Sequence, residues 1–395
     1  MRKVLIKDIG KVITGNTPSK TNSEFYASKD IGFVKPDIIA DSGISSITST
    51  NEYISEKARS KARIVEKDTI FVTCIGSIGK VGISEGREYA FNQQINAIEV
   101  NEKAISKYLA YNLLSNKNRL VLMANAPVVP IINKTQFENF EIFIDENIDN
   151  QKKIVNILDK AKQIISLKRS QLNELDNLIK SRFIEMFGDP VKNTMNWEMS
   201  KLGDLSIQIN SGNTPKGGEQ VYVDEGITFF RSQNVWKDKL EMEDIAFIDK
   251  ETHENMKRSS LKHGDILMTK TGRINTENSS LGRAALYMGE DDAANVNGHV
   301  YFIRLKPDIN NEFILKILVS KEYLVYIRSV CVGGIDKRQL NKNHIEDFPI
   351  ICPPKDLQNK FIEFVHQVDK IKNEVQSALS ETQKLFDSLM QTYFD

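Results

Sequence analysis

The stretch Thr14-Gly-Asn-Thr-Pro18 returns almost unchanged as Ser211-Gly-Asn-Thr-Pro215, about halfway along the 395-residue chain. Each copy follows a short segment of the form Leu-x-x-(Gly)-Asp-(Ile/Leu). Glycine tolerates positive φ and proline fixes the exit of the chain, so each copy predicts a structural turn. A turn that recurs at this distance indicates an internal repeat of about 200 residues, and this repeat decides the fold class.

Further matched segments follow the two turns in the same order. They are 31–35 with 227–231, 67–73 with 263–269, 92–98 with 297–303, and 133–134 with 341–342. The offset in numbering drifts from about 197 to about 208, which indicates an insertion in the second half near 274–280. Matches that keep their order along the chain predict two similar domains.

Each predicted domain combines strands with at least one helix. Short β-like runs bounded by Gly, Asn, Asp and Pro are expected at 31–34, 69–73 and 95–100, and again at 228–231, 265–269 and 300–305. Amphipathic helices are expected near 103–115 and 312–319. The domain is therefore of mixed α and β type, with a strand order that the pattern does not give.

Each half closes with a long apolar heptad pattern, which predicts a coiled coil. The first helix is expected to end at Phe187-Gly188-Asp189-Pro190, because glycine and proline follow helix ends. The alternative is that each helix is buried separately in its own domain. A length of 34 residues, which spans about 50 Å, favours a helix pair. The predicted partner-binding positions on the helices are Ile154, Leu158, Ile165, Leu172, Leu175, Ile179, Phe361, Val368, Ile371, Val375, Leu385 and Leu389.

The predicted fold class is therefore α+β. Two similar mixed α/β domains are separated by two long antiparallel coiled-coil helices, with pseudo-two-fold internal symmetry. We expect the first domain at 1–147, the first helix at 148–188, the second domain at 189–354 and the second helix at 355–395.

The net charge is zero, with 53 basic and 53 acidic residues, which argues against a protein that binds polyanions over its whole surface. Local basic segments are nevertheless present in both halves. Six Lys or Arg stand against two acidic residues in 57–80, and the same numbers hold in 257–283. One such segment is usually a solvated surface, but two at equivalent places of a repeat indicate a shared nucleic-acid-binding surface.

The remaining composition indicates a cytoplasmic protein. Hydrophobic residues make up 40% and charged residues 27%, and no run of about 18 apolar residues predicts a membrane span. The N-terminus becomes polar too early for a signal peptide. The three scattered cysteines suggest a reducing compartment.

The sequence predicts no catalytic site and no metal site. The segment 76–81 resembles a phosphate-binding loop, but its spacing is wrong and Val81 cannot bind magnesium. His253-Glu254 begins like a zinc-protease helix but lacks the second histidine. We therefore expect a non-catalytic protein that holds no cofactor itself.

The assembled pattern resembles the specificity subunit of type I restriction–modification systems. The resemblance covers nearly the whole chain, and its most telling parts are the paired turns and the stretch from Phe183 to Trp197 that leads into Lys201-Leu-Gly-Asp-Leu205. It implies that each domain reads one half of a bipartite site in double-stranded DNA, and that the helices set the gap between the halves.

The same resemblance implies several partners. Two modification subunits would dock on the helices and bind S-adenosylmethionine, and restriction subunits would use ATP and Mg. The first domain departs from the second because it is shorter around 74–83 than the second is around 270–286, so its loop there is expected to read DNA differently.

Phosphate contacts are expected from Lys and Arg, and base contacts from Arg, Lys, Asn, Gln, Ser or Thr on loops. The candidates in the first domain are Lys35, Lys57, Arg59, Lys61, Arg63, Lys80, Gln93 and Gln94. Those in the second are Arg231, Ser232, Gln233, Asn234, Lys270, Thr271, Arg273, Arg283, Lys337 and Arg338. For each position alone, an ordinary surface residue is the alternative interpretation.

Two other functions remain open from the sequence. One is a coiled-coil scaffold that binds no nucleic acid. The other is an enzyme with unusual ligands, such as a nuclease. The paired basic segments favour DNA binding over both.

Overall fold

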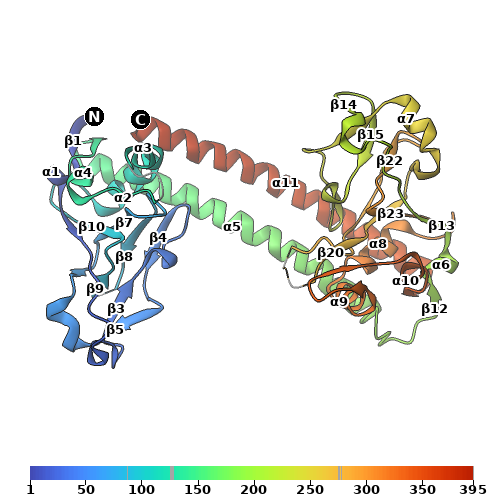
Figure 1. Cartoon of the computed structure of the whole chain (residues 1–395), viewed down its shortest axis with the longest axis horizontal. Coiled ribbons are helices and arrows are strands. Elements are labelled where there is room, and N and C mark those ends of the chain that lie inside the picture. The colour runs from blue at the N-terminus through green and yellow to red at the C-terminus, as the bar shows by residue number, and fades with distance from the viewer. Residues whose placement is uncertain (87, 125–128, 275, 277, 395) are drawn as a thin grey trace. The chain divides into compact units, whose positions relative to one another are not determined.

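The computed structural model describes residues 1–86, 88–124, 129–274, 276 and 278–394 (Figure 1). The chain divides into two compact units. The first consists of Met1–Gln171 and the chain from Val375 onward, and the second is Leu172–Glu374. Each unit contains one α/β domain and one segment of each of the two long helices, α5 (Ile148–Phe187) and α11 (Lys355–Phe394).

The first unit contains three sheets with the orders β2-β10-β7-β8-β4, β5-β3-β9-β6 and β1-β11. The strands are β1 (Arg2–Leu5), β2 (Gly10–Thr14), β3 (Ile31–Val34), β4 (Ile44–Ile47), β5 (Glu52–Ile54), β6 (Ile64–Glu66), β7 (Ile70–Thr73), β8 (Val81–Ser84), β9 (Glu88–Phe91), β10 (Ile95–Val100) and β11 (Glu141–Ile144). The helices are α1 (Ile6–Ile9), η1 (Ser23–Tyr26), η2 (Pro36–Ile38), η3 (Glu56–Lys61), α2 (Ser106–Ser115), α3 (Lys117–Met123) and α4 (Lys134–Glu138).

The second unit contains larger sheets with the orders β13-β23-β19-β21 and β14-β18-β15-β22, and the smaller sheets β12-β26, β16-β17 and β20-β25-β24. The strands are β12 (Met199–Lys201), β13 (Ser206–Ser211), β14 (Tyr222–Val223), β15 (Ile227–Phe230), β16 (Val235–Trp236), β17 (Lys239–Leu240), β18 (Ala246–Ile248), β19 (Ile266–Thr269), β20 (Thr271–Arg273), β21 (Ala284–Leu286), β22 (Ala294–Val296), β23 (Val300–Leu305), β24 (Val332–Gly333), β25 (Lys337–Gln339) and β26 (Pro349–Ile351). The helices are α6 (Leu202–Leu205), η4 (Gly218–Val221), η5 (Ser232–Asn234), α7 (Lys250–Asn255), η6 (Lys257–Ser259), α8 (Asn311–Leu318), α9 (Lys321–Val330) and α10 (Lys342–Glu346).

The internal repeat predicted from the sequence is confirmed at the level of strand order. The sheet β2-β10-β7-β8 of the first unit corresponds to β13-β23-β19-β21 of the second. The parallel pair β3–β9 corresponds to the parallel pair β15–β22. The six predicted strands are all present to within one residue at either end, and the predicted helices become α2 and α8.

The long helices pack antiparallel within each unit. In the first unit, Ile154 and Leu158 from the start of α5 share one hydrophobic cluster with Met390 and Phe394 from the end of α11. In the second unit, the Phe183 ring near the end of α5 lies 5.4 Å from the ring of Phe361, near the start of α11. Neither helix is therefore buried separately inside a domain, which excludes that alternative.

The apolar residues at the predicted helix positions are only partly buried. Leu158 and Phe361 are fully buried, whereas Ile371 is 43% exposed and Leu385 is 56% exposed. Leu172, Leu175, Ile179 and Leu389 are half-buried. A tight coiled coil would bury all of these positions. The heptads thus predicted the helix pair correctly but overestimated how continuously it is buried.

The end of α5 is fixed by side chains of the following loop. Gly188 adopts a φ of 74°, and its N–H donates to the Ile184 carbonyl (2.9 Å), as in a helix C-terminus closed by a left-handed residue. Trp197 Nε1 donates to the Phe187 carbonyl (3.0 Å), which has no partner within the helix. The predicted end at Phe187 is confirmed.

Among the described residues, no helix is long and apolar enough to cross a membrane.

Candidate nucleic-acid interface

The Gly-Asn-Thr-Pro turn brings two backbone segments into close contact in each unit. A Cβ atom on Gly15 would lie 2.1 Å from the Asn92 carbonyl oxygen, and one on Gly212 would lie 1.9 Å from the Val296 carbonyl oxygen. Gly15 N–H also donates to the Ile95 carbonyl (3.1 Å). Only glycine allows this approach, so the segment has a structural role. The predicted reason was wrong, because neither Gly15 nor Gly212 adopts a positive φ; the close approach of the second backbone is what requires glycine.

Asn16 of this turn holds a basic loop in the first unit. Its Nδ2 donates to the Lys61 carbonyl (2.6 Å), and its Oδ1 accepts from the Arg63 N–H (2.7 Å). Both ends of the carboxamide are therefore used to fix the backbone that carries two exposed cations. From the sequence, Asn16 was predicted only as part of a turn, although its recurrence as Asn213 indicated a larger role.

Lys61 and Arg63 are two accessible cations of the first basic segment, which also contains the exposed Lys67. Lys61 and Arg63 are both exposed, and neither has an ion-pair partner among the described residues. By contrast, Lys57 Nζ lies 3.0 Å from Glu24 Oε1, and Arg59 Nη2 lies 2.7 Å from Glu88 Oε2. The hydrogen bond from Arg59 holds the pKa of the Glu88 carboxyl below its usual value, so that ion pair persists at neutral pH.

Lys35 and Arg231 occupy equivalent positions after β3 and β15, and each has an acidic partner. Lys35 forms an ion pair with Glu52. Arg231 Nη2 lies 3.1 Å from Asp244 Oδ2 and donates to the Asp244 carbonyl (2.5 Å), while only 13% of the side chain is exposed. Both predicted base readers are thus held by their own domain, and neither is positioned to reach into a groove without breaking that contact.

Asn234 corrects the expectation for the segment after Arg231. It is 1% exposed, and its Nδ2 donates to the carbonyls of Glu241 (3.1 Å) and Asp244 (3.0 Å). Because these contacts use its whole donor capacity, Asn234 is a structural residue. Gln233 is exposed and contacts Asp244 Oδ2 (3.1 Å), and Ser232 is half-buried.

Lys80 and Arg283 are also anchored, at equivalent positions before β8 and β21. Lys80 is 12% exposed and lies 2.8 Å from Asp41 Oδ1. Arg283 is 6% exposed, donates from Nε to the Ser279 carbonyl (3.0 Å), and stacks 3.8 Å from the centroid of the Trp236 ring. Burial lowers the pKa of Arg283. The prediction that Arg283 contacts DNA is therefore wrong in this conformation, because its guanidinium lies inside the domain.

Gln93 and Gln94 differ in accessibility. Gln93 is exposed, and its Oε1 accepts from the Thr17 hydroxyl of the Gly-Asn-Thr-Pro turn (2.8 Å). Gln94 is half-buried, and its Oε1 accepts from Asn92 Nδ2 (2.8 Å). Gln93 therefore keeps a free amide group beside the turn, whereas Gln94 belongs to the packing of the loop.

In the second unit, two candidate segments that are distant in sequence meet in one small sheet. Strand β20 pairs antiparallel with β25, so that Arg273 lies opposite Lys337 and Gly272 lies opposite Arg338. Lys270, just before β20, accepts at its carbonyl from the Leu340 N–H (2.8 Å). The structure thus brings Lys270, Thr271, Arg273, Lys337 and Arg338 together at one small sheet.

A polar pocket of about 670 Å³ lies beside the second Gly-Asn-Thr-Pro turn. It is lined by Asn213, Thr214, Pro215, Lys216, Thr252, Asn255 and Met256, a set without an acidic residue. Asn213 Oδ1 accepts from Arg258 Nη2 (3.2 Å) at its edge. Lys216 and Arg258 were not among the predicted DNA contacts, although Arg258 lies in the basic segment 257–283.

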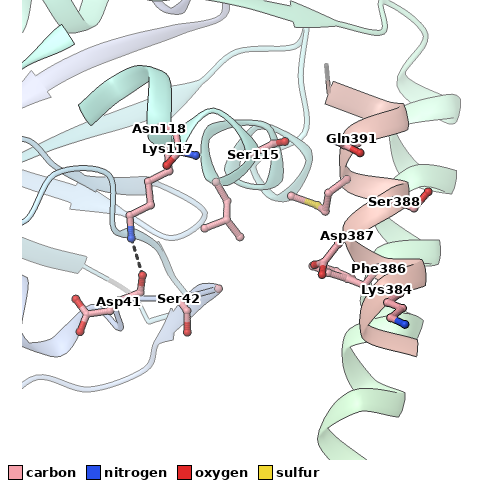
Figure 2. Close-up of a pocket in the computed structure, with 13 residues that line it drawn as sticks. Asp41, Ser42, Ser115, Lys117, Asn118, Lys384, Phe386, Asp387, Ser388 and Gln391 are labelled. Atoms are coloured by element: carbon pink, nitrogen blue, oxygen red, sulfur yellow. Dashed lines mark hydrogen bonds between the residues drawn. The ribbon is translucent and has the colours of Figure 1, made fainter. Parts of the chain in front are cut away.

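A larger pocket of about 850 Å³ lies in the first unit, between the loop at 41–43, the junction of α2 and α3, and the end of α11 (Figure 2). Lys117 Nζ donates to the Asp41 carbonyl (2.7 Å) at one side of it. Its lining contains two acidic residues, Asp41 and Asp387, and two basic residues, Lys117 and Lys384. Balanced charge gives no preference for an anion, so we do not assign DNA to this pocket.

Within the described residues, no group of three or more His, Cys, Asp or Glu side chains is placed to hold a metal ion. The three cysteines are free thiols. Burial raises the pKa of Cys74 to about 12, so this thiol is protonated at neutral pH and is a poor nucleophile.

The repeated domain, with segments of two shared long helices, defines a class of proteins that carry two tandem copies of one recognition fold. The sequence matches the type I restriction modification DNA specificity domain over residues 1–177 and again over 195–382. The chain therefore belongs to the family of type I restriction–modification specificity proteins.

Individual relatives agree with this assignment. The chain is 26% identical to the type I restriction enzyme MjaIX specificity subunit of Methanocaldococcus jannaschii, over 98% of this chain and 90% of that protein. It is 29% identical to the HindI specificity subunit of Haemophilus influenzae, over 45% of this chain and 40% of that protein.

Solved structures show the same fold. The type I restriction–modification S subunit from M. genitalium aligns over 100% of this chain and 96% of its own, with a TM-score of 0.57 and 16% identity. A chain from a study of complex assembly and conformational transition of the type I R-M system aligns over 99% of this chain and 97% of its own, with a TM-score of 0.63 and 15% identity.

Proposed function

We propose that this chain gives a type I restriction–modification complex its DNA sequence specificity, with each domain reading one half of a bipartite target. The observation that carries the proposal is the covalent duplication of one domain on two shared helices, in a member of this family. Two equivalent domains in one chain suit a target made of two separate half-sites.

Each domain has exposed basic residues that support this proposal, on a loop in the first domain and on a small sheet in the second. In the first, Asn16 fixes the loop that carries Lys61 and Arg63. In the second, the sheet β20-β25-β24 gathers Arg273 and Lys337. Exposed cations on a fixed backbone neutralise DNA phosphates, and they do so at the edge of loops that can reach base edges.

The long helices are proposed to set the gap between half-sites and to dock two modification subunits. Support comes from apolar side chains that α5 leaves exposed: Ile157, Ile164 and Leu167 are 42%, 44% and 60% exposed in the first unit. Spacings of seven and three residues place these side chains on one face of the helix, and an exposed apolar patch on one face is typical of a protein-binding surface. Restriction subunits are the further expected partners.

The chain itself is proposed to be non-catalytic and cytoplasmic. S-adenosylmethionine, ATP and Mg would then be bound by the partner subunits. One experiment tests the recognition function and identifies the DNA target. Methylated adenines are mapped in the source genome by single-molecule sequencing, with and without the gene for this chain. A bipartite motif with a fixed gap that disappears on deletion supports the proposal, and an unchanged methylation pattern contradicts it.

The phosphate contacts are tested separately by the salt dependence of DNA binding. Changing Lys61 and Arg63 together to alanine should reduce the slope of log K against log salt by roughly 2, because each phosphate contact contributes about 0.9. An unchanged slope removes this loop from the interface.

A further inference from the structure

The second domain contains a loop that is longer than its counterpart in the first. The hydroxyl of Thr73 donates to the carbonyl of Ser77, four residues on, whereas the hydroxyl of the equivalent Thr269 donates to Ser280, eleven residues on. Both loops then return to the same point, since the backbone N–H of Lys80 donates to the Thr73 hydroxyl (3.0 Å) and that of Arg283 donates to the Thr269 hydroxyl (2.9 Å). The second domain therefore has seven additional residues in this place.

The additional length includes a strand that the first domain lacks among its described residues. In the second unit, β20 pairs with β25 over three residues, and β24 pairs with the other edge of β25. In the first unit, the corresponding contact is a single bridge between Ile75 and Ile131, next to a hydrogen bond from Gly76 N–H to the Pro130 carbonyl (3.0 Å). One domain thus presents a polar ribbon where the other presents apolar residues.

One face of the ribbon lies against its own domain and the other is free. Gly272, in the middle of β20, is buried, and a Cβ there would lie 2.2 Å from the Leu281 backbone nitrogen. Because side chains alternate along a strand, the neighbours of Gly272 point to the opposite face. Directly opposed residues share a face, so this free face carries Thr271, Arg273, Lys337 and Gln339.

The free face is accessible and chemically suited to reading bases. Arg273 is 68% exposed, and Lys337 and Gln339 are exposed. Val332, opposite Gln339 on β24, is 42% exposed. Arginine and lysine pair with guanine O6 and N7, glutamine pairs with adenine N6 and N7, and threonine or valine contacts the thymine methyl group.

We propose that the β20–β25 ribbon enters the DNA major groove and reads about three base pairs of the half-site bound by the second domain. This inference rests on the proposed function. A pair of β-strands fits the major groove, which is about 12 Å wide, and not the minor groove, which is about 6 Å wide. The third strand of this sheet, β24, adds only the two residues that pair with β25. Three residues at about 3.4 Å each cover roughly three base pairs, which are also about 3.4 Å apart.

Two neighbouring residues have different roles in this arrangement. Asp336 Oδ2 lies 3.3 Å from Arg273 Nε and positions the guanidinium over the free face. Arg338 lies opposite Gly272 and so belongs to the face that lies against the domain, where it is half-buried and its Nε donates to the Gly334 carbonyl (3.4 Å). The described residues of the first domain form only the Ile75–Ile131 bridge in this place.

The test uses the full chain in complex with its modification subunits. A pool of randomised DNA duplexes is selected for binding, first with the wild-type complex to define both half-sites and then with single variants. Arg273→Ala and Gln339→Ala should each relax the preference at one or two adjacent base pairs of one half-site by roughly 5- to 150-fold, and leave the other half-site and the gap unchanged. Arg338→Ala changes a residue of the same strand on the opposite face, and should leave the base preference unchanged.

Lys306→Ala is the matched control. Lys306 is an exposed cation of the same unit, and it directly follows the C-terminal end of β23 instead of lying on the ribbon. This substitution should leave base preference unchanged. Melting curves of each complex verify that the variants are folded, as expected for side chains this exposed.

The groove is tested with modified duplexes of the selected motif. Replacing each purine in turn by its 7-deaza analogue removes N7, which only the major groove exposes. Wild-type binding should fall at a purine of the second half-site, and Arg273→Ala or Gln339→Ala should abolish that sensitivity. Sensitivity to inosine, which lacks the minor-groove amino group of guanine, in place of 7-deaza sensitivity would overturn the groove assignment.

Failure of the ribbon inference and failure of the proposed function give different experimental results. If the wild-type complex selects a bipartite motif and no ribbon variant changes any base of it, the ribbon inference is wrong and the proposed function stands. If the wild-type complex selects no motif at all, the proposed function fails, and the ribbon inference fails with it.

Discussion

Replacing Gly212 by alanine should destabilise the second unit strongly, because the Gly-Asn-Thr-Pro turn leaves no space for a side chain. The new Cβ would lie 1.9 Å from the Val296 carbonyl oxygen and 2.4 Å from the Asn297 carbonyl oxygen. Both atoms belong to backbone, so no rotamer change can relieve the clash. The strand end at Val296, where β22 pairs with β15, would have to move.

The expected cost follows from the size of that movement. An ordinary Cβ contact is about 3.4 Å or more, so the backbone must shift by more than 1 Å. Overpacking of this kind costs roughly 3 kcal/mol, at the upper end of the usual range. For a unit of 150–250 residues, 1 kcal/mol lowers Tm by about 2–4 °C, so Gly212→Ala should lower the Tm of the second unit by about 6–12 °C.

Calorimetry of the purified full chain measures this effect, provided that the transitions of the two units are resolved. Gly15→Ala makes the equivalent change in the first unit, where Cβ would lie 2.1 Å from the Asn92 carbonyl oxygen, and should lower the other transition. Gly334→Ala is the matched control, because nothing lies within 4 Å of its Cβ. It should change the free energy of unfolding by no more than about 1 kcal/mol. If Gly212→Ala melts like Gly334→Ala, the close approach of the two backbones is wrong.

Three further outcomes are expected. Asn16→Ala removes both hydrogen bonds to the loop at 61–63 and should cost about 1–3 kcal/mol; amide exchange at that loop should accelerate, and unchanged protection would contradict the clamp. Phe183→Ala removes a 5% exposed ring from the aromatic cluster at the helix pair and should cost about 3–5 kcal/mol in urea unfolding, whereas Ile184→Ala, at a 42% exposed neighbour, should cost far less; equal values would contradict the packing. Cys74 should resist alkylation at pH 8, because burial raises its pKa from 9.0 to about 12. Since the thiol ionises at lower pH in the unfolded chain, the free energy of unfolding should fall as pH rises from about 9 towards 12. A Cys74→Ala variant should lose that pH dependence.

The sequence predicted most of the architecture because the relevant signals are local. Short β-like runs bounded by Gly, Asn, Asp and Pro predicted β10 and β23, heptads predicted α5 and α11, and Gly188 with Pro190 predicted the end of α5. The repeat then required two similar domains, without any knowledge of strand order. Several short strands of the first domain, such as β4 and β6, carried no such pattern and were missed.

The candidate DNA contacts were predicted less well, because residue type indicates what a side chain can bind and not what already holds it. Arg231 is neutralised by Asp244, and Lys80 by Asp41. Arg283 lies under Trp236. Each of these partners is distant in sequence, so no local pattern distinguishes such a cation from the exposed Lys61.

By itself, the sequence determined that this protein consists of one domain fold written twice, closed each time by a long helix, because periodicity and recurrence are properties of the chain alone. Only the tertiary structure decided which basic residues are accessible and which strands they share. The pairing of Arg273 with Lys337 across β20 and β25 is one such decision. The accessibility of each basic residue depends on contacts between segments that only folding brings together. It also depends on whether an acidic or aromatic side chain of the same domain already holds the cation.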